Sequence, residues 1–414
     1  MYLQIAWRNI WRNPRRTAVI LTAVVIGVWI MVFLGALMYG VTDQMIKNSI
    51  ATLTGNIQIH HPEYRNDPVI ENTMAIQEDQ QEDQQEKLIT SLEKNLPPGS
   101  LWTSRIRVNA VASNARHSSG ITLVGIEPDK EAEVSFIAQG IVQGKYLQPD
   151  DKHGIIIGRA FADKFETKLG HKLVLMSQAA DREMASRAFR IVGIYRADLE
   201  ATEKAFAFVN MPSARKMLKL ETGLSEISVI IPENIDEEIV AQSLKKALPD
   251  SYSIETWKEL LPLITAYVEM NKGFSIMWNF VVFIAMGFGI VNTMLMAVFE
   301  RMREFGLLKA LGMKPWWIII EVLTESLFIL ILGILIGNAV SLASVLALSE
   351  TGINLSAFAA AMEYTGMPRI IFPVIQIDQV ILANLVVLVL GLIVSIYPAV
   401  KAAGFTPVEA MSHY

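Results

Sequence analysis

The sequence predicts a membrane protein with four transmembrane α-helices and a large α+β domain inserted between the first two helices. The 414-residue chain is 52% hydrophobic, with a mean hydropathy of +0.36, which is unusual for a soluble protein of this length. Four stretches reach the roughly 20 apolar residues that a spanning helix needs. About 230 residues of mixed composition separate the first two stretches, which is enough for a folded domain.

The apolar stretches set the boundaries of the predicted spans. They cover residues 17–41, 273–299, 316–348 and 379–400. The third stretch is longer than one crossing requires, so we expect it to tilt or to extend beyond the bilayer. The first apolar run, of about 25 residues, exceeds the ~7–15 residues of a cleaved signal core. No convincing small-x-small cleavage site follows this run, so we expect an uncleaved signal anchor.

Basic residues predict the orientation of the spans. The segment 1–16 contains no acid, and its bases are Arg8, Arg12, Arg15 and Arg16. The loop 300–315 is also rich in bases, whereas the loop 349–378 has Arg369 as its only base. The positive-inside rule therefore places both termini, including the tail 401–414, and the loop 300–315 in the cytoplasm. The inserted domain, 42–272, and the loop 349–378 then face outward.

The N-terminal segment has a second possible role beside orientation. Apolar residues recur on one helical face, whereas the arginines lie on another; the apolar residues are Leu3, Trp7, Ile10 and Trp11. This pattern predicts an interfacial helix over 1–16 with tryptophans at headgroup depth. The alternative is a basic flank that only orients the first span.

The inserted domain alternates between strand and helix patterns. We expect strands at 56–60, 104–112, 121–126, 154–158, 171–177, 188–195 and 205–209. We expect helices at 159–168, 211–220 and 234–247. The strand-rich portion, about 100–205, suggests a subdomain. Residues 257–272 predict a stalk helix that continues into the second span, with a possible kink at Pro262.

Several kinds of chemistry are not supported by the sequence. There is no P-loop motif for ATP, no His-Glu-x-x-His zinc motif and no Gly-x-Ser-x-Gly nucleophile motif. His60 and His61 with Glu63 do not predict a metal site, because adjacent strand residues point to opposite faces. The chain has no cysteine, and its net charge of −5 gives no sign of nucleic-acid binding. We therefore expect neither a cofactor nor a metal in this chain.

The segment 300–315 is the most informative part of the sequence. It begins with charged residues, has a helical pattern, and ends between Gly312 and Pro315, with an apolar span on either side. A short amphipathic helix held between two spans is suited to receiving force from another protein. The candidate residues are Glu300, Arg301, Arg303, Glu304, Gly306, Lys309 and Gly312.

The third span contains unusual residues of two kinds. Glu321 and Glu325 lie one helical turn apart near its start, where negative charge is favoured at a helix N-terminus. We interpret them as interfacial packing or helix-contact residues; a proton relay is the alternative. Gly333 and Gly337 form a G-x-x-x-G pattern that allows helices to approach closely in lipid.

Three motifs resemble those of the MacB/FtsX/LolC–LolE permeases of ABC transporters. Residues 303–312, Arg-Glu-Phe-Gly-Leu-Leu-Lys-Ala-Leu-Gly, are similar to the family's cytoplasmic signature, and Glu325 matches the acid that follows it. Residues 397–411 are similar to the family's C-terminal motif, and residues 7–17 to its N-terminal segment. Residues 55–64 resemble the opening of the external domain in permeases called lipoprotein-releasing, although the N-terminus departs from the LolC and LolE start.

The resemblance implies a subunit without catalytic residues in the bacterial inner membrane, with a periplasmic domain. Two permease subunits, identical or paralogous, pair with two separate ATPase subunits that bind ATP and Mg. The segment 300–315 is then the coupling helix. Its charged residues contact the ATPase or anchor the helix, Gly306 allows close approach, and Gly312 ends the helix.

The size of the inserted domain favours lipoprotein release among the family's functions. The partners then include an acylated lipoprotein and a periplasmic chaperone or adaptor. The alternatives are MacB-like export of small molecules or peptides with periplasmic partners, and FtsX-like signalling to a periplasmic effector. A membrane-anchored enzyme is a further alternative, for which the sequence offers no catalytic constellation.

Overall fold

The computed structural model describes residues 8, 11–65, 70–74, 81–197, 199–220, 222–355 and 370–406. The chain forms two compact units. The helical unit comprises Met1–Asp43, Tyr267–Ala357 and Ile370–Tyr414, and the inserted domain is built mainly from Gln44–Ala266. The predicted interfacial helix at 1–16, the loop 349–378 and the tail 401–414 lie partly or largely outside the described residues.

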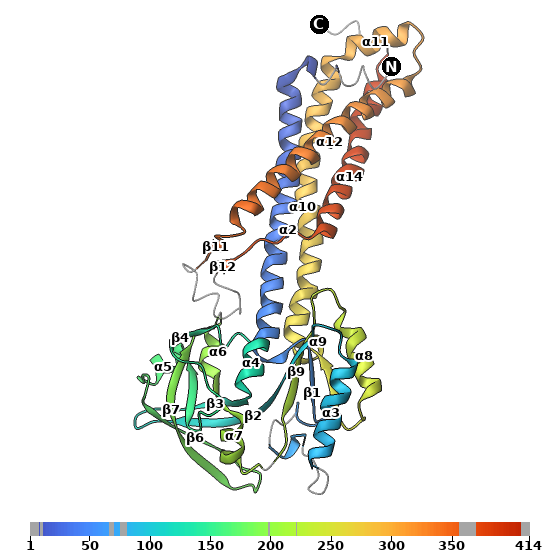
Figure 1. Cartoon of the computed structure of the whole chain (residues 1–414). Helices are drawn as coiled ribbons and strands as arrows, with labels where there is room; N and C mark the ends of the chain where they lie inside the picture. Colours follow the sequence, from blue (N-terminus) through green and yellow to red (C-terminus); the bar gives the residue numbers. More distant parts are fainter. Residues whose placement is uncertain are drawn as a thin grey trace. The chain divides into compact units, whose positions relative to one another are not determined.

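Four long helices are apolar enough to cross a membrane, which confirms the predicted fold class (Figure 1). They are α2 (Pro14–Ser49), α10 (Pro262–Glu300), α12 (Pro315–Leu348) and α14 (Ile377–Gly404). Each helix extends past the apolar stretch that identified it. A short helix, α11 (Met302–Ala310), lies between α10 and α12, and the small strands β11 (Ile353–Asn354) and β12 (Ile370–Ile371) pair with each other.

The predicted stalk is not one continuous helix. A single turn, α9 (Trp257–Leu260), ends at Leu261, and the long helix α10 starts at Pro262 instead of Trp257. Leu261 has φ −120° and ψ 64°, outside the helical region. A residue that precedes proline is disfavoured in the α conformation, and proline itself suits the first position of a helix. The chain therefore breaks at Leu261, where a kink within one helix was expected.

The inserted domain contains one 10-stranded sheet with short helices around it. The strands are β1 (Ile57–His60), β2 (Leu101–Ser113), β3 (Ser118–Ile126), β4 (Ile141–Gly144), β5 (Gly154–Gly158), β6 (Lys172–Gln178), β7 (Met184–Tyr195), β8 (Phe206–Asn210), β9 (Glu226–Ile230) and β10 (Ser253–Thr256). The helices are α3 (Gln81–Asn95), α4 (Pro128–Val134), α5 (Arg159–Lys164), α6 (Glu200–Ala205), α7 (Met211–Leu218) and α8 (Glu237–Ala247). A π-helix, Ile50–Thr54, follows α2, and a 3-10 turn covers Ile70–Asn72.

Part of this sheet closes on itself. β2 pairs with β3, β3 with β8, β8 with β5, β5 with β7, β7 with β6, and β6 with β2. β2 is 13 residues long, so it pairs with β9 at its start and with β6 at its end. The strands β9, β1 and β10 thereby extend the sheet beyond the ring. The predicted strand-rich portion at 100–205 falls in this ring, and it shares one sheet with the rest of the domain.

Each unit has its own apolar core. In the inserted domain, buried residues of most strands supply it; examples are Ile57, Ile106, Leu123, Ile157 and Val229, each at 0% exposure. In the helical unit, the core combines residues from all four long helices, such as Val24, Ile290, Ile329 and Val387. Apolar side chains on one face of each long helix pack together and stabilise the helical unit.

Candidate functional site

The segment 300–315 forms a helix–turn unit with defined ends. Arg301 has φ −100° and ψ 13° and separates α10 from the nine-residue helix α11. At the other end, Gly312 has φ +95°, a left-handed conformation that glycine adopts at little cost. Gly312 N donates to Lys309 O at 3.0 Å, and Met313 N donates to Leu308 O at 3.0 Å. These two bonds form a Schellman motif, so Gly312 ends the helix.

Arg301 is bound to carboxylates on two elements. Its Nη2 donates to Glu321 Oε1 at 2.7 Å, its Nη1 to Glu325 Oε2 at 3.0 Å, and its Nε to Glu304 Oε2 at 3.1 Å. The Arg301 side chain is 14% exposed, whereas Glu321 and Glu325 are 9% and 4% exposed. The guanidinium also lies 5.0 Å from the centre of the Phe305 ring. One side chain therefore joins the start of α11 to α12.

The first long helix is part of the same charge cluster. Arg16 Nη2 donates to the second oxygen of Glu325 at 2.6 Å, so this carboxylate lies between two guanidinium groups. Arg16 Nη1 lies 3.9 Å from Glu300 Oε2, and Asn13 Nδ2 donates to the same oxygen at 3.3 Å. These contacts connect α2 with the end of α10 and the start of α12.

Glu304 links the cluster to the segment before α2. It accepts hydrogen bonds from both Arg12 and Arg301. Partial burial would raise the pKa of the Glu304 carboxyl, but these bonds outweigh burial and lower it below its usual value. Burial would likewise lower the pKa of the Arg301 guanidinium, but the neighbouring Glu325 and Glu321 carboxylates raise it. Both groups are therefore charged near neutral pH and remain paired.

Lys309 connects the far end of α11 to α14. Its Nζ donates to the backbone oxygens of Ala403 at 2.8 Å and Phe405 at 2.7 Å. The carbonyl groups at a helix C-terminus lack intrahelical donors and favour a positive charge. The ring of Phe405 also contacts Phe299 of α10, with centroids 5.7 Å apart. Lys309 therefore caps α14 and faces inward.

The opposite side of α11 is exposed, and we call it the outer face. It consists of Arg303, Leu307, Ala310, Leu311 and Lys314. Leu307 is 59% exposed and Leu311 is 77% exposed. The spacing of three to four residues places the helical members on one side, with a basic residue at each end. Arg301, Glu304 and Lys309 lie on the inner side, where their side chains bind other parts of the chain.

The outer-face leucines were missed by the sequence analysis, which concentrated on charged and glycine positions. A helical wheel centred on Phe305 could have predicted them. Phe305 is 1% exposed and marks the buried side of α11, and Leu307 and Leu311 lie on the opposite side. Gly306 is buried beside Phe305. Gly306 therefore lies on the inner side of α11, and Arg303 is the candidate that lies on the outer face.

The two glycines predicted to pack helices lie at the contact between α12 and α2. A Cβ placed on Gly333 would lie 2.4 Å from Val24 Cγ1, and one on Gly337 would lie 2.7 Å from Val28 Cβ. Real side chains do not approach so closely, so this contact depends on glycine at both positions. Together with Glu325, these glycines bring α12 against α2.

The comparisons with known proteins bear on two parts of the chain. The sequence model of the MacB-like periplasmic core domain matches residues 17–247. The model of the FtsX-like permease C-terminal region matches residues 276–407, which contain the outer face and the part of the charge cluster formed by Arg301, Glu304, Glu321 and Glu325.

The chain belongs to the MacB/FtsX/LolC family of ABC transporter permeases.

Relatives with this family's domains resemble the chain at moderate identity. The lipoprotein-releasing system transmembrane protein LolC of Xylella fastidiosa strain 9a5c is 25% identical over 324 residues, covering 74% of this chain and 76% of LolC. An uncharacterized ABC transporter permease of Methanocaldococcus jannaschii is 27% identical over 279 residues, covering 66% of this chain and 65% of that permease. The macrolide export ATP-binding/permease protein MacB of Campylobacter jejuni strain 81-176 is 24% identical, covering 65% of this chain and 37% of MacB.

Solved structures were also compared. The periplasmic region of MacB from Actinobacillus actinomycetemcomitans is 13% identical with a TM-score of 0.36, covering 55% of this chain and 98% of that region. The extracellular domain of YknZ, from Gram-positive bacteria, is 14% identical with a TM-score of 0.32, covering 48% of this chain and 99% of that domain.

Replacing Lys309 with methionine in this MacB/FtsX-family permease should leave ATPase binding intact but impair transport. We expect the variant to bind its ATPase normally, because Lys309 faces away from the outer face. We expect transport to fall about tenfold, since α11 no longer holds the end of α14 through a charged donor. Binding and transport are measured together on reconstituted complexes. Lys309→Arg is the control, and normal transport by Lys309→Met would show that the bond is not needed.

Proposed function

We propose that this permease transmits conformational change between a separate ATPase dimer and its inserted domain, with α11 as the coupling helix. The carrying observation is that the outer face of α11 exposes Leu307 and Leu311 between two basic residues, while the inner side is bound to α12, to α14 and to Arg12 before α2. Exposed leucines flanked by basic side chains are suited to a cleft with an apolar floor and acidic edges.

The bonds around α11 support transmission. Arg301 joins it to α12, Glu304 joins it to Arg12 before α2, and Lys309 joins it to the end of α14. A force applied to the outer face would therefore reach several membrane helices at once. Such a device needs no nucleophile or metal, and ATP and Mg would bind on the partner ATPase. Within the described residues, no group of three metal-ligating side chains occurs.

The proposed orientation follows from the basic residues at this end of the helical unit. Both chain termini and α11 lie in the cytoplasm, and the inserted domain faces the periplasm across the bacterial inner membrane. Two such permease subunits, identical or paralogous, would act on one ATPase dimer.

The proposed substrate class is an acylated lipoprotein released from the inner membrane, passed to a periplasmic chaperone or adaptor. Support comes from the LolC relative, which aligns over about three quarters of both chains. Export of a small molecule or peptide is the second candidate. MacB of Chlorobaculum tepidum favours it, being 35% identical over 125 residues, although this covers 30% of the chain and 17% of that protein.

The coupling proposal is tested by placing a negative charge on the outer face. Leu307→Asp and Leu311→Asp should each weaken binding of the partner ATPase at least about thirtyfold, as expected for a central interface residue. Both side chains are exposed, so folding should be unaffected. The measurement is retention of the ATPase on the purified permease. Leu263→Asp is the matched control, since Leu263 is 86% exposed but lies at the start of α10.

Unchanged ATPase binding by both leucine variants would refute α11 as the docking element. The substrate class has its own measurement: mass spectrometry of proteins retained by an ATP-trapped complex from native membranes. Acylated lipoproteins should be enriched relative to the Leu307→Asp permease purified in the same way, which we expect to retain little ATPase. Enrichment of an adaptor or outer-membrane protein without acylated protein would instead favour export.

A further inference from the structure

One face of the sheet in the inserted domain is polar but buried. Directly opposite residues of antiparallel strands share a face, and the register of β1, β9 and β2 brings polar side chains together on one face. We call this set the polar layer, and it consists of Gln58, His60, Thr103, Arg105, Glu226 and Ser228. Each of these residues is at most 5% exposed. The intervening residues, such as Ile57 and Ile59, point into the apolar core on the other face.

Other segments of the inserted domain cover the polar layer. Glu131 of α4 accepts two hydrogen bonds from Arg105, at 3.0 Å and 2.8 Å. The backbone of Gly55, just after the π-helix, comes so close that a Cβ on it would lie 2.5 Å from Ser228 Oγ. The polar face of an antiparallel sheet is commonly exposed to solvent. Here the same alternation of apolar and polar residues has its polar side inside the domain.

Several polar atoms of the layer have no hydrogen-bond partner among the described residues. They are Gln58 Nε2, His60 Nε2, Ser228 Oγ and both carboxylate oxygens of Glu226. Glu226 lies between two guanidinium groups, but Arg105 Nη1 and Arg107 Nη1 are 3.6 Å and 3.7 Å from its oxygens. These distances exceed those of direct hydrogen bonds. Buried polar groups nearly always have a partner, which is often an ordered water.

The His60 ring needs a hydrogen-bond donor on its Nε2 side. Its Nδ1 lies 2.8 Å from His61 O. A carbonyl oxygen only accepts, so Nδ1 carries the hydrogen, and Nε2 of the neutral ring is then an acceptor. This Nε2 lies 3.9 Å from Glu255 Oε2, which is also an acceptor. A water molecule between the two atoms could donate one hydrogen to each.

The charges of the layer favour a neutral ligand over an ion. Arg105 and Arg107 balance Glu131 and Glu226, so an added anion would meet a carboxylate and an added cation would meet two guanidinium groups. The ligand must also both donate and accept, because Gln58 Nε2 only donates whereas the oxygens of Glu226 only accept. Water meets both requirements.

We propose that the polar layer binds a cluster of ordered water molecules. These waters would bridge the Glu226 carboxylate to the guanidinium groups of Arg105 and Arg107, and would donate to His60 Nε2. The strand β1, by which the chain enters the sheet after α2, would then have a dry core on one face and bound water on the other. The coupling mechanism uses none of these residues.

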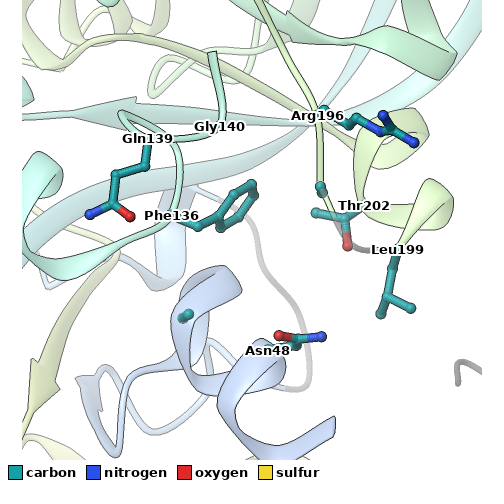
Figure 2. Close-up of a pocket in the computed structure, with 9 residues that line it drawn as sticks. Asn48, Phe136, Gln139, Gly140, Arg196, Leu199 and Thr202 are labelled. Carbon is teal, nitrogen blue, oxygen red and sulfur yellow. The ribbon is translucent and has the colours of Figure 1, made fainter. Parts of the chain in front are cut away.

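A cavity elsewhere in the inserted domain supplies a reference for solvent access. It measures about 240 Å³, and Figure 2 shows Phe136, Leu199 and Thr202 among its lining residues. None of its described lining residues belongs to the polar layer. Phe136 is half-buried, so solvent reaches its ring directly.

The test is X-ray hydroxyl-radical labelling of the full chain in non-ionic detergent, read by mass spectrometry of its peptides. The X-ray pulse converts bound water into hydroxyl radicals in place, and these oxidise adjacent side chains that bulk solvent does not reach. His60 is one reporter, and Tyr64 is the other, because its OH donates to Arg107 O at 2.7 Å. Phe189 is the matched dry control, since it is 1% exposed within the apolar core.

We expect oxidation of His60 and Tyr64 at rates close to that of Phe136 and severalfold above that of Phe189. A His60 as unreactive as Phe189 would show that the layer is dry and would overturn the proposal. Oxidation of Ile57 to the same extent as His60 would show that the whole strand opens to bulk solvent, which would also overturn it.

A pair of variants on β1 tests the site itself. Gln58→Leu removes a donor from the polar layer and should lose part of the His60 oxidation. Ile59→Leu changes the next residue, on the apolar face of the same strand, and should leave that oxidation unchanged. Equal His60 oxidation in the two variants, at unchanged melting temperatures, would show that the polar layer does not hold the water.

Discussion

Replacing Arg301 with methionine should destabilise the helical unit by about 3 kcal/mol, because removing one partner of a buried charge pair leaves its acids uncompensated. Glu321 and Glu325 would lose their nearest cation on α11, although Arg16 still contacts Glu325. The start of α11 would also lose its link to α12. We therefore expect the variant to lose transport as well as stability.

Arg303→Met is the matched control for this prediction. It removes an arginine of the same helix, two positions along the chain, from the exposed side. Unfolding in detergent, followed by tryptophan fluorescence, should show a large loss for Arg301→Met and little change for Arg303→Met. ATPase binding should instead be weakened by Arg303→Met and little changed by Arg301→Met. Equal stability of the two variants would mean that the Arg301 cluster contributes no net stability.

Replacing Gly333 with leucine should separate α12 from α2 and cost several kcal/mol. Even a Cβ at this position would lie 2.4 Å from Val24 Cγ1, and Val24 is fully buried. Adding methylene groups to a well-packed core typically costs ~1–3 kcal/mol, and here the whole side chain is added. Correct insertion with a lowered unfolding temperature is the expected result.

A compensating substitution makes the Gly333 prediction sharper. Gly333→Ala alone should destabilise the protein, whereas Gly333→Ala combined with Val24→Ala should recover part of the loss by making space for the new methyl group. Gly273→Ala provides the control, because nothing lies within 4 Å of a Cβ at that position of α10. No recovery in the double variant would show that the close approach of α2 and α12 does not depend on this contact.

Local chemistry in the sequence was sufficient for much of the fold. Apolar length identified the four spans, since a helix that crosses lipid must satisfy its own backbone groups. Pro315 and Gly312 marked the ends of α12 and α11 correctly, because their conformational limits act within one turn. Pro262 was noticed, but its effect at Leu261 was underestimated. The short strands β4, β9 and β10 were missed, since four or five residues carry little periodic signal.

The pairing of distant residues was decided only by tertiary structure. The sequence by itself determined four membrane-spanning helices, a large inserted domain and a charged helix within 300–315, which the structure narrows to Met302–Ala310. It did not determine that Arg301 faces Glu321 and Glu325, that Lys309 caps α14, or that Leu307 and Leu311 remain exposed. The sequence contains the same charged residue whether its side chain binds a partner protein or another part of its own chain. Only the packing of α11 against α12, α14 and the segment before α2 decides which side of α11 is exposed.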